Sequence, residues 1–418
     1  MLVRRIELLL IIVTSLYLGA CANKTLDGVF PGTQQGTGVG SDACTSASLL
    51  QNQFIVQWED GHTSVETSEN AELFKQKFIL PQLGKISHVE FDQKLELHSA
   101  PAVRVSAVGS STAWGQNTVF ASSAWNAGIN GQGVLVGVVD AAVDYTHPQI
   151  QPRLAPNQAE INGRAGIDDD GNGFVDDFYG WDFQQNQNNP ANIVSATNDH
   201  GTHVSGIIAA DHSRGSMQGV APQAQIVPAN FMDASGSGSL GGAIQAIQYV
   251  SMRGVKVINA SWGGPVCSQT LKAVVNNLAS QNILFVVASG NDGVDLDSVS
   301  DYPASFNFPN QVTVAASNSS DFLTSWSNTS FNIVHLGAPG DSIYSTVPGG
   351  YAYMSGTSMA TPFVTGTAAL LWSLRPAATY AQIKQALLAG VDNKGFRVKT
   401  QGRLNISNSI NALKQILP

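Results

Sequence analysis

The chain has 418 residues, of which 43% are hydrophobic and 12% are charged. This composition excludes a disordered chain, and the length suits a large domain with further segments in front of it. The formal net charge is −9, and the sequence contains no run of basic residues. We therefore expect no nucleic acid among its partners.

The N-terminus predicts export. Arg4 and Arg5 precede an apolar run over residues 8–18, which is too short to span a bilayer and is typical of a signal-peptide core. The run ends in an LGAC motif that resembles the lipobox of bacterial lipoproteins. That resemblance implies a signal peptide over 1–21 and a lipid on Cys21, which would hold the precursor in the cell envelope. The alternative is a signal peptide of the soluble kind.

A flexible tether and a small α+β unit are predicted next. Residues 22–52 are rich in Gly, Thr, Ser and Gln, as flexible linkers are. Within 53–107, the patterns predict a strand over 53–58, a helix over 71–78 and a strand over 102–106. A unit of this size has only marginal stability by itself.

Two cysteines remain after Cys21, namely Cys44 and Cys267. In an oxidising compartment they can form a disulfide. They fall in different predicted segments, and sequence spacing does not show whether they meet. A disulfide and two inert thiols both stay open.

From Trp114 onward the chain alternates strands and helices. Unbroken apolar runs are typical of strands buried on both faces, and helical stretches separate them. The strands are expected at 134–139, 225–228, 255–258, 283–288 and 312–315, and the helices near 240–252 and 269–280. This alternation predicts an α/β fold over 114–418, with a parallel sheet flanked by helices. Such sheets bind ligands at the carboxyl ends of their strands, where Asp140 and Asn291 fall.

A serine lies at the start of the longest apolar helix. The segment GTSMATP at 356–362 opens a helix that runs to about residue 374. Ser358 thus lies where backbone N–H groups and the helix dipole favour negative charge. A serine hydroxyl is a weak nucleophile and needs a base. Taken alone, Ser358 is equally well explained as a helix N-cap.

The segment NDHGTHVSG at 198–206 begins another apolar helix and supplies that base. A zinc site would require the spacing of His-Glu-x-x-His, and neither the glutamate nor the spacing is present. His200 is therefore predicted as a general base. We expect His203 to pack or to form hydrogen bonds within the fold.

Six segments together resemble the subtilase family of serine proteases, whose catalytic triad runs in the order Asp, His, Ser. They are VVD at 138–140, HGTHV at 200–204, GVAP at 219–222, SWGG at 261–264, ASGN at 288–291 and GTSMATP at 356–362. The resemblance implies a subtilisin-like fold and a secreted, monomeric serine endopeptidase with polypeptide substrates. The order of the triad argues against an α/β-hydrolase, in which Ser precedes Asp and His.

The resemblance also implies a role for each site residue. Ser358 would be the nucleophile, His200 its base, Asp140 the group that orients His200, and Asn291 a donor to the oxyanion. The residues implied in substrate binding are Ser261, Trp262, Gly263, Gly236 and Gly238.

Two features keep other interpretations open. The family places Thr or Ser and then Gly after the aspartate, whereas this chain has Ala141 and Ala142. A catalytically silent relative that binds peptides or partners is therefore the alternative function. The segment 53–107 resembles an inhibitory pro-domain in position and pattern, and a stalk or binding module is its alternative.

An acidic segment, DDDGNGFVDD at 168–177, predicts a calcium site. Its five carboxylates would repel one another without a cation, and oxygen ligands spaced around a glycine turn suit Ca²⁺. Subtilases with such an insertion resemble this pattern. The expected ligands are Asp168, Asp170, Asn172, Asp177 and the carbonyl of Phe174. A solvated acidic loop is the alternative.

Asp301 precedes a Tyr-Pro pair that follows the ASGN segment. In the subtilase pattern, this position lines the floor of the pocket for the side chain preceding the cleaved bond. A carboxylate there would attract lysine or arginine, as an aspartate does in trypsin. The alternative is an ordinary surface aspartate that caps a turn.

Overall fold

The computed structural model describes residues 49–97, 103–104, 113–188, 199–265 and 267–418. The described chain divides into two compact units, the first spanning Gln51–Phe91 and the second comprising Leu49–Leu50 and the residues from Asp92 onward. Our predictions for the signal peptide, Cys21, Cys44 and most of the tether lie outside the described residues.

The first unit is a curved sheet with one helical segment. Its elements are β1 (Leu49–Trp58), β2 (Thr63–Thr67), α3 (Ala71–Phe74), a π-helical turn (Lys75–Ile79), α4 (Leu80–Gln82) and the first part of β3 (Ile86–Glu96). Strands β1 and β2 pair antiparallel, and β3 lies on the other side of β1. The core is aromatic: Phe54 stacks on Phe74 with 4.1 Å between ring centroids.

Two strand predictions for this region need correction. Strand β3 was not expected, because its apolar residues are spaced irregularly and do not alternate with polar ones. The strand expected at 102–106 is described only as β4 (Val103–Arg104), and it does not pair with β1, β2 or β3. It instead pairs antiparallel with β14 (Gly350–Met354) in the second unit.

The second unit is built on a large, mainly parallel sheet. Within the described residues this sheet has nine strands in the order β15-β16-β12-β11-β10-β9-β5-β7-β6, and only β15 runs antiparallel. The strands are β5 (Leu135–Asp140), β6 (Trp181–Asp182), β7 (Gln225–Asn230), β9 (Val257–Ala260), β10 (Leu284–Ala288), β11 (Gln311–Ser317), β12 (Leu336–Pro339), β15 (Asp392–Asn393) and β16 (Gly402–Arg403). The predicted α/β fold with a flanked parallel sheet is confirmed.

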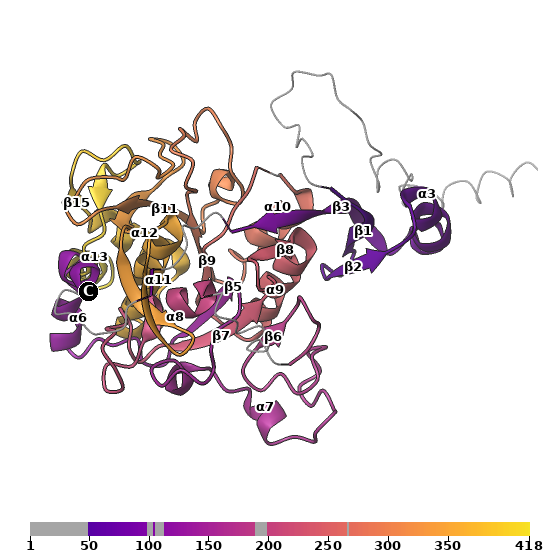
Figure 1. Ribbon diagram of the computed structural model, residues 1–418, viewed down its shortest axis with the longest axis horizontal. Helices are drawn as coiled ribbons and strands as arrows, with labels where there is room; N and C mark the ends of the chain where they lie inside the picture. Colours follow the sequence, from indigo (N-terminus) through magenta and orange to yellow (C-terminus); the bar gives the residue numbers. More distant parts are fainter. Residues whose placement is uncertain (1–48, 98–102, 105–112, 189–198, 266) are drawn as a thin grey trace, which may run out of the picture. The chain divides into compact units, whose positions relative to one another are not determined.

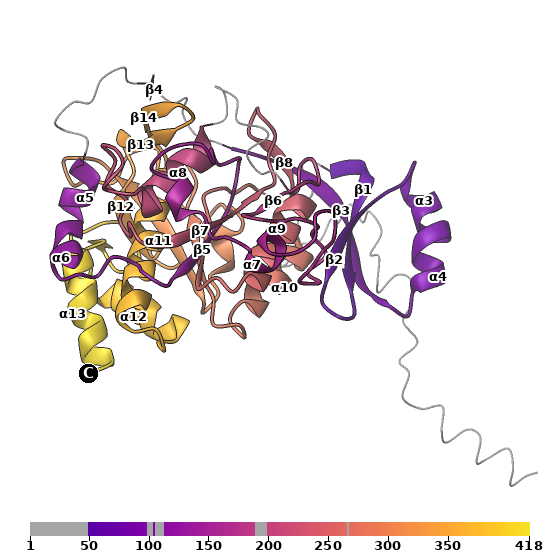
Figure 2. The same ribbon diagram turned by 90° about the horizontal axis from the view of Figure 1, so that it is seen from below.

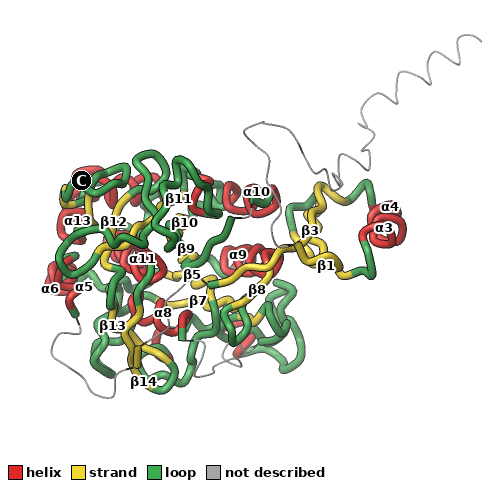
Figure 3. Tube along the Cα trace, turned by 45° about the horizontal axis from the view of Figure 1, so that its top comes forward, coloured by secondary structure: helices red, strands yellow, loops and turns green. Residues whose placement is uncertain are grey.

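Helices cover both faces of this sheet (Figure 3). One face packs against α8 (His200–Ala209) and α11 (Thr357–Leu374), which share a core with Val136 and Val138 of β5. The other face packs against α9 (Leu240–Met252), where Val250 approaches Gly137, and α10 (Gln269–Asn277) lies beside α9.

The remaining elements complete the second unit. Helices α12 (Tyr380–Ala389) and α13 (Ile406–Ile416) pack together, and α13 also contacts α6 (Ala121–Asn126), as Figure 2 shows. The others are α5 (Trp114–Thr118), α7 (Gln158–Ile161) and β8 (Ser237–Ser239), of which α7 and β8 are labelled in Figure 1. Strand β13 (Ile343–Val347) forms a hairpin with β14, and both are labelled in Figure 2. No helix among the described residues is both long and apolar enough to cross a bilayer.

The order in which the strands are added to the sheet changes side at β5. The chain proceeds from β5 to β6 and β7 on one side, and then crosses to β9 on the other side of β5. Open α/β sheets bind their ligands outside the carboxyl ends of the strands at such a switch point. Asp140 ends β5, and Ser261 directly follows β9.

Candidate active site

An aspartate and a histidine meet at the switch point. The Nδ1 atom of His200 lies 2.6 Å from Oδ1 of Asp140, and both side chains are buried. Asp140 is placed by the end of β5, and His200 is the first residue of α8. The backbone N–H of Ala141 also donates to Oδ1 of Asp140 at 2.7 Å. This carboxylate therefore fixes the orientation of the imidazole.

The outer atoms of this pair have no hydrogen-bond partner. Oδ2 of Asp140 and Nε2 of His200 are both buried and unpaired within the part of the chain that the structure describes. The Nε2 atom is the one that a general base needs unpaired. The unpaired Oδ2 is consistent with the alanine at position 141, which has no hydroxyl to offer.

Ser358 occupies the first turn of α11, and 5% of its surface is exposed. Its hydroxyl donates to the carbonyl of Ser261 at 2.9 Å, and the Ser261 hydroxyl donates to the Ser358 carbonyl, also at 2.9 Å. These two bonds tie the start of α11 to the end of β9. In this state the Ser358 hydroxyl is directed to Ser261 and not to His200.

Asn291 and the first turn of α11 each supply one N–H group beside Ser358, namely the side-chain amide of Asn291 and the backbone N–H of Ser358. The Oδ1 atom of Asn291 accepts from the backbone N–H and from the hydroxyl of Thr357, both at 2.9 Å. A Cβ placed on Gly356 would lie 3.6 Å from both Nδ2 of Asn291 and the backbone nitrogen of Ser358. Both nitrogens thus border one small space beside the serine, as donors to a developing oxyanion must.

His203, the second histidine of the HGTHV motif, has a structural role in the core. His203 is fully buried, and its Nε2 lies 3.0 Å from the carbonyl of Ile343 and 3.2 Å from that of Ala352. Burial, and next the nearby His200, lower the pKa of His203 to about 3. The residue is therefore neutral near pH 7, as its expected packing role requires.

The end of β3 and the residue that follows it, 94–97, lie along β8. Lys94–Glu96 pairs antiparallel with Ser237–Ser239, and the backbone N–H of Leu97 donates to the carbonyl of Gly236 at 2.9 Å. The Leu95 side chain is buried and would lie 3.6 Å from a Cβ on Gly264. Sequence reasoning placed substrate at Gly236 and Gly238, but it gave no signal that this segment would lie there.

A pocket opens beside Ser358. Its lining includes Ser261, Gly263, Asn291 and Asp301, so four of the residues expected around the substrate lie together. Trp262 also borders it, but its indole is buried and donates to the carbonyl of Val139 at 2.9 Å. Trp262 therefore supports the wall of the pocket mainly through packing.

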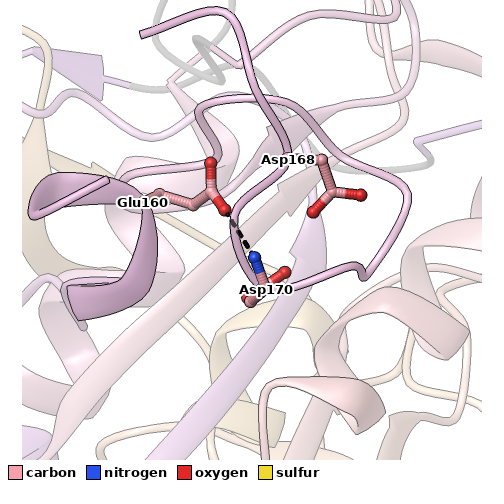
Figure 4. Close-up of side chains that lie close together, drawn as sticks. All are labelled: Glu160, Asp168 and Asp170. Atoms are coloured by element: carbon pink, nitrogen blue, oxygen red, sulfur yellow. Dashed lines mark hydrogen bonds between the residues drawn. The ribbon is translucent and has the colours of Figure 1, made fainter. Parts of the chain in front are cut away.

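The acidic segment 168–177 brings three carboxylates together. Oxygen atoms of Glu160, Asp168 and Asp170 all lie within 4.8 Å of one another, as Figure 4 shows. The backbone N–H of Asp170 donates to Oε1 of Glu160 at 3.2 Å. Hydrogen bonds from backbone N–H groups, first that of Gly173, lower the pKa of Asp168, so this carboxyl stays charged. Clustered carboxylate oxygens are the donor set that Ca²⁺ prefers.

The expected ligand set differs from this cluster. Asp177 is fully buried and is not part of it, because its carboxylate already contacts Tyr249 at 2.7 Å and Arg253 at 3.2 Å. Asn172 contacts Asp170 and Asp177, both at 3.2 Å, and its Oδ1 accepts from the backbone N–H of Phe174. Glu160 was missed because it lies in α7, eight residues before the acidic segment begins.

Cys267 takes part in a disulfide. The interpretation of Cys267 as an inert free thiol is therefore wrong. The chain has only two other cysteines, Cys21 and Cys44, and both lie outside the described residues.

Comparisons with known proteins agree with this fold. The model of the subtilase family matches residues 131–406, which contain all six motifs. The chain therefore belongs to the subtilase family.

Individual relatives cover different shares of the chain. Subtilisin-like protease 1 of Plasmodium berghei is 35% identical over 298 residues, which are 65% of this chain and 49% of the relative. Subtilisin E of Bacillus subtilis is 35% identical over 279 residues, 66% of this chain and 65% of the relative. The alkaline protease of Alkalihalobacillus alcalophilus is 32% identical over 359 residues, 84% of each chain. The chain thus spans about half the length of the Plasmodium relative it matches.

Proposed function

We propose that the chain is a serine endopeptidase that hydrolyses peptide bonds in polypeptides. The observation that carries the proposal is the 2.6 Å contact between Asp140 and His200, together with a serine at a helix N-terminus and the amide of Asn291 beside it. The names of its relatives, which include subtilisins and an alkaline protease, support the same activity.

The mechanism follows from the orientation of each group. Ser358 turns its hydroxyl from the carbonyl of Ser261 to the unpaired Nε2 of His200, and its oxygen attacks the carbonyl carbon of the peptide bond. His200 accepts the hydroxyl proton and returns it to the leaving amine. Asp140 accepts the hydrogen bond from Nδ1–H of His200 and stabilises the charged imidazole. In the second half-reaction, water attacks the carbonyl carbon of the acyl group while His200 takes its proton. The bond to the Ser358 oxygen then breaks, and His200 returns the proton to that oxygen.

The oxyanion of each tetrahedral intermediate lies between two N–H donors, Nδ2 of Asn291 and the backbone nitrogen of Ser358. Both are held before the reaction, the first through the bonds between Asn291 and Thr357 and the second by α11. Donors that are already oriented stabilise developing charge without a cost of reorganisation.

The second candidate function is a catalytically silent peptide-binding subtilase. The observation in its favour is the unpaired Oδ2 of Asp140, which leaves this carboxylate with fewer hydrogen bonds than it can accept. All reacting groups are nevertheless present. Labelling with a fluorophosphonate probe separates the two functions. An active enzyme labels on Ser358, the Ser358→Ala variant does not, and His200→Ala labels much more slowly. Absence of label in the wild type would favour the silent relative.

We further propose that the segment up to Leu97 is an inhibitory pro-segment, which makes the chain a zymogen. Its antiparallel pairing with β8 and the buried Leu95 are what an extended peptide bound beside the active site would show. A stalk would not need to be paired at this strand.

Calcium is the proposed structural cation. Glu160, Asp168 and Asp170 are the proposed ligands, and Asn172 and the Phe174 carbonyl are candidates to complete the set. Neutralising three adjacent carboxylates would fix the loop that follows α7. The lipid on Cys21 and the location of the precursor in the cell envelope are likewise proposals, supported by the LGAC motif alone.

A further inference from the structure

The pocket beside Ser358 carries negative charge. Among the described residues that line it, the charged ones are Asp292 and Asp301, and none is basic. Asp292 is exposed, whereas Asp301 keeps part of its surface accessible and buries its Oδ1 atom. The two carboxylates therefore occupy different depths of the same pocket.

The inner carboxylate has no counter-charge. Oδ1 of Asp301 has no hydrogen-bond partner within the described part of the chain. A buried carboxylate oxygen without a hydrogen-bond partner is costly, and a cationic group that pairs with it offsets this cost. Burial, and next the nearby charge of Asp292, raise the pKa of Asp301 to about 7.

Two glycines leave space at this carboxylate. A Cβ on Gly263 would lie 2.4 Å from Oδ1 of Asp301, and a Cβ on Gly290 would lie 3.1 Å from Oδ2. Any side chain at Gly263 would therefore collide with the carboxylate. At Gly263 and Gly290 the backbone approaches Asp301 closely, and these two positions place no side chain beside the carboxylate.

The position of the pocket identifies the group that would enter it. Ser358 and Asn291 both line the pocket, and they act on the carbonyl carbon and the carbonyl oxygen of the bond that is cleaved. The side chain nearest to them is that of the residue that contributes this carbonyl. We propose that the pocket binds a lysine or arginine side chain at this residue, with Asp301 as its counter-charge and Asp292 as a second carboxylate. The inference rests on the proposed endopeptidase activity.

The test compares peptides that differ only in the residue before the cleaved bond, using Arg, Lys, Gln and Leu. We expect wild-type kcat/KM for Arg and Lys to exceed that for Leu on the order of 30-fold or more, as for one buried charge pair. Asp301→Asn should remove most of this preference while Leu cleavage remains. Asp292→Asn should reduce it less, and Asp297→Asn, an exposed aspartate that does not line the pocket, should leave it unchanged.

The pH dependence gives a second readout. Below about pH 7 the Asp301 carboxyl is mainly neutral, and above it the carboxyl is ionised, so the attraction for a cation grows as the pH rises. The ratio of kcat/KM for Arg to that for Leu should therefore increase through about pH 7. Effects of pH on the chemical step are common to both peptides and cancel in the ratio. In Asp301→Asn the ratio should not change with pH.

The outcomes separate this inference from the proposed function. A wild type that labels with fluorophosphonate on Ser358 but cleaves Leu as well as Arg would overturn the pocket assignment alone. The same conclusion would follow if Asp301→Asn kept the full preference. A wild type that neither labels nor cleaves any peptide would overturn the proposed function, and this inference with it.

Discussion

Asn291 is the residue whose role has the clearest kinetic signature. For subtilisin itself, loss of the asparagine donor to the oxyanion costs about 10²–10³ in kcat. Because Asn291 occupies the corresponding motif, we expect Asn291→Ala to lower kcat by about the same factor, with KM nearly unchanged, since the donor acts on the transition state. Steady-state kinetics on one peptide measures both constants.

A matched variant separates catalysis from structure at this position. Asn291→Asp keeps an oxygen that can accept from Thr357 but loses the Nδ2 donor. It should lose kcat as Asn291→Ala does while it retains more of the wild-type thermal stability. If both variants changed KM and left kcat intact, Asn291 would not be an oxyanion donor.

Single residues of the site are predictable from the sequence because each chemical role demands one residue type in a characteristic segment. Asp140 and His200 lie 60 positions apart, yet each is marked by its own motif, and the fold brings the two side chains into contact. Glu160 has no such signal, because a glutamate in a short helix has no distinctive pattern. Its proximity to Asp168 depends on how the loop folds back.

At the scale of elements, the loop after α7 should respond to calcium. Chelation with EGTA should lower the melting temperature, because a ligand at 100 times its Kd stabilises the folded state by about 2.7 kcal/mol. Asp168→Asn should lower the melting temperature in calcium and make it insensitive to EGTA. Asp297→Asn serves as a control outside the cluster. An unchanged melting temperature, with no calcium found by metal analysis, would indicate a solvated acidic loop.

The strand that pairs with β8 gives a second prediction at this scale. After processing, the fragment that ends beyond Leu97 should remain bound to the catalytic part. Leu95 is buried, whereas Lys77 is exposed and lies outside the paired segment, so Leu95→Ala should weaken this association and Lys77→Ala should not. Burial of a leucine side chain contributes about 1.5–3 kcal/mol, so we expect binding at least tenfold weaker. Co-purification and titration of the fragment measure this. Equal effects of the two variants would contradict the pairing.

The elements themselves were predictable to different degrees. The central strands of the sheet are apolar runs because helices cover both faces, and the run at 134–139 became β5 almost without change. Strand β3 was missed because its apolar residues are spaced irregularly and because it buries two polar residues, Asp92 and Gln93. The pairing of β4 with β14 joins segments about 250 positions apart, and local pattern carries no information about such contacts.

At the scale of the whole molecule, the proposed lipid determines where the precursor is found. We expect the full-length precursor in the membrane fraction and a shorter form, which has lost the N-terminal segments, in the soluble fraction. Cys21→Ser should move the precursor out of the membrane fraction without changing peptide cleavage by the mature form. If the lipidated full-length protein were the only active species, release of a shorter form from the membrane would be refuted.

The central claim is that Ser358, activated by His200 and Asp140, cleaves peptide bonds. The most direct measurement compares wild type and Ser358→Ala, expressed as full chains, for hydrolysis of a peptide library and for maturation of the precursor. The account predicts that wild type cleaves peptides and shortens its own precursor, and that Ser358→Ala remains folded, uncut and inactive. Peptide cleavage by Ser358→Ala at the wild-type rate would contradict it.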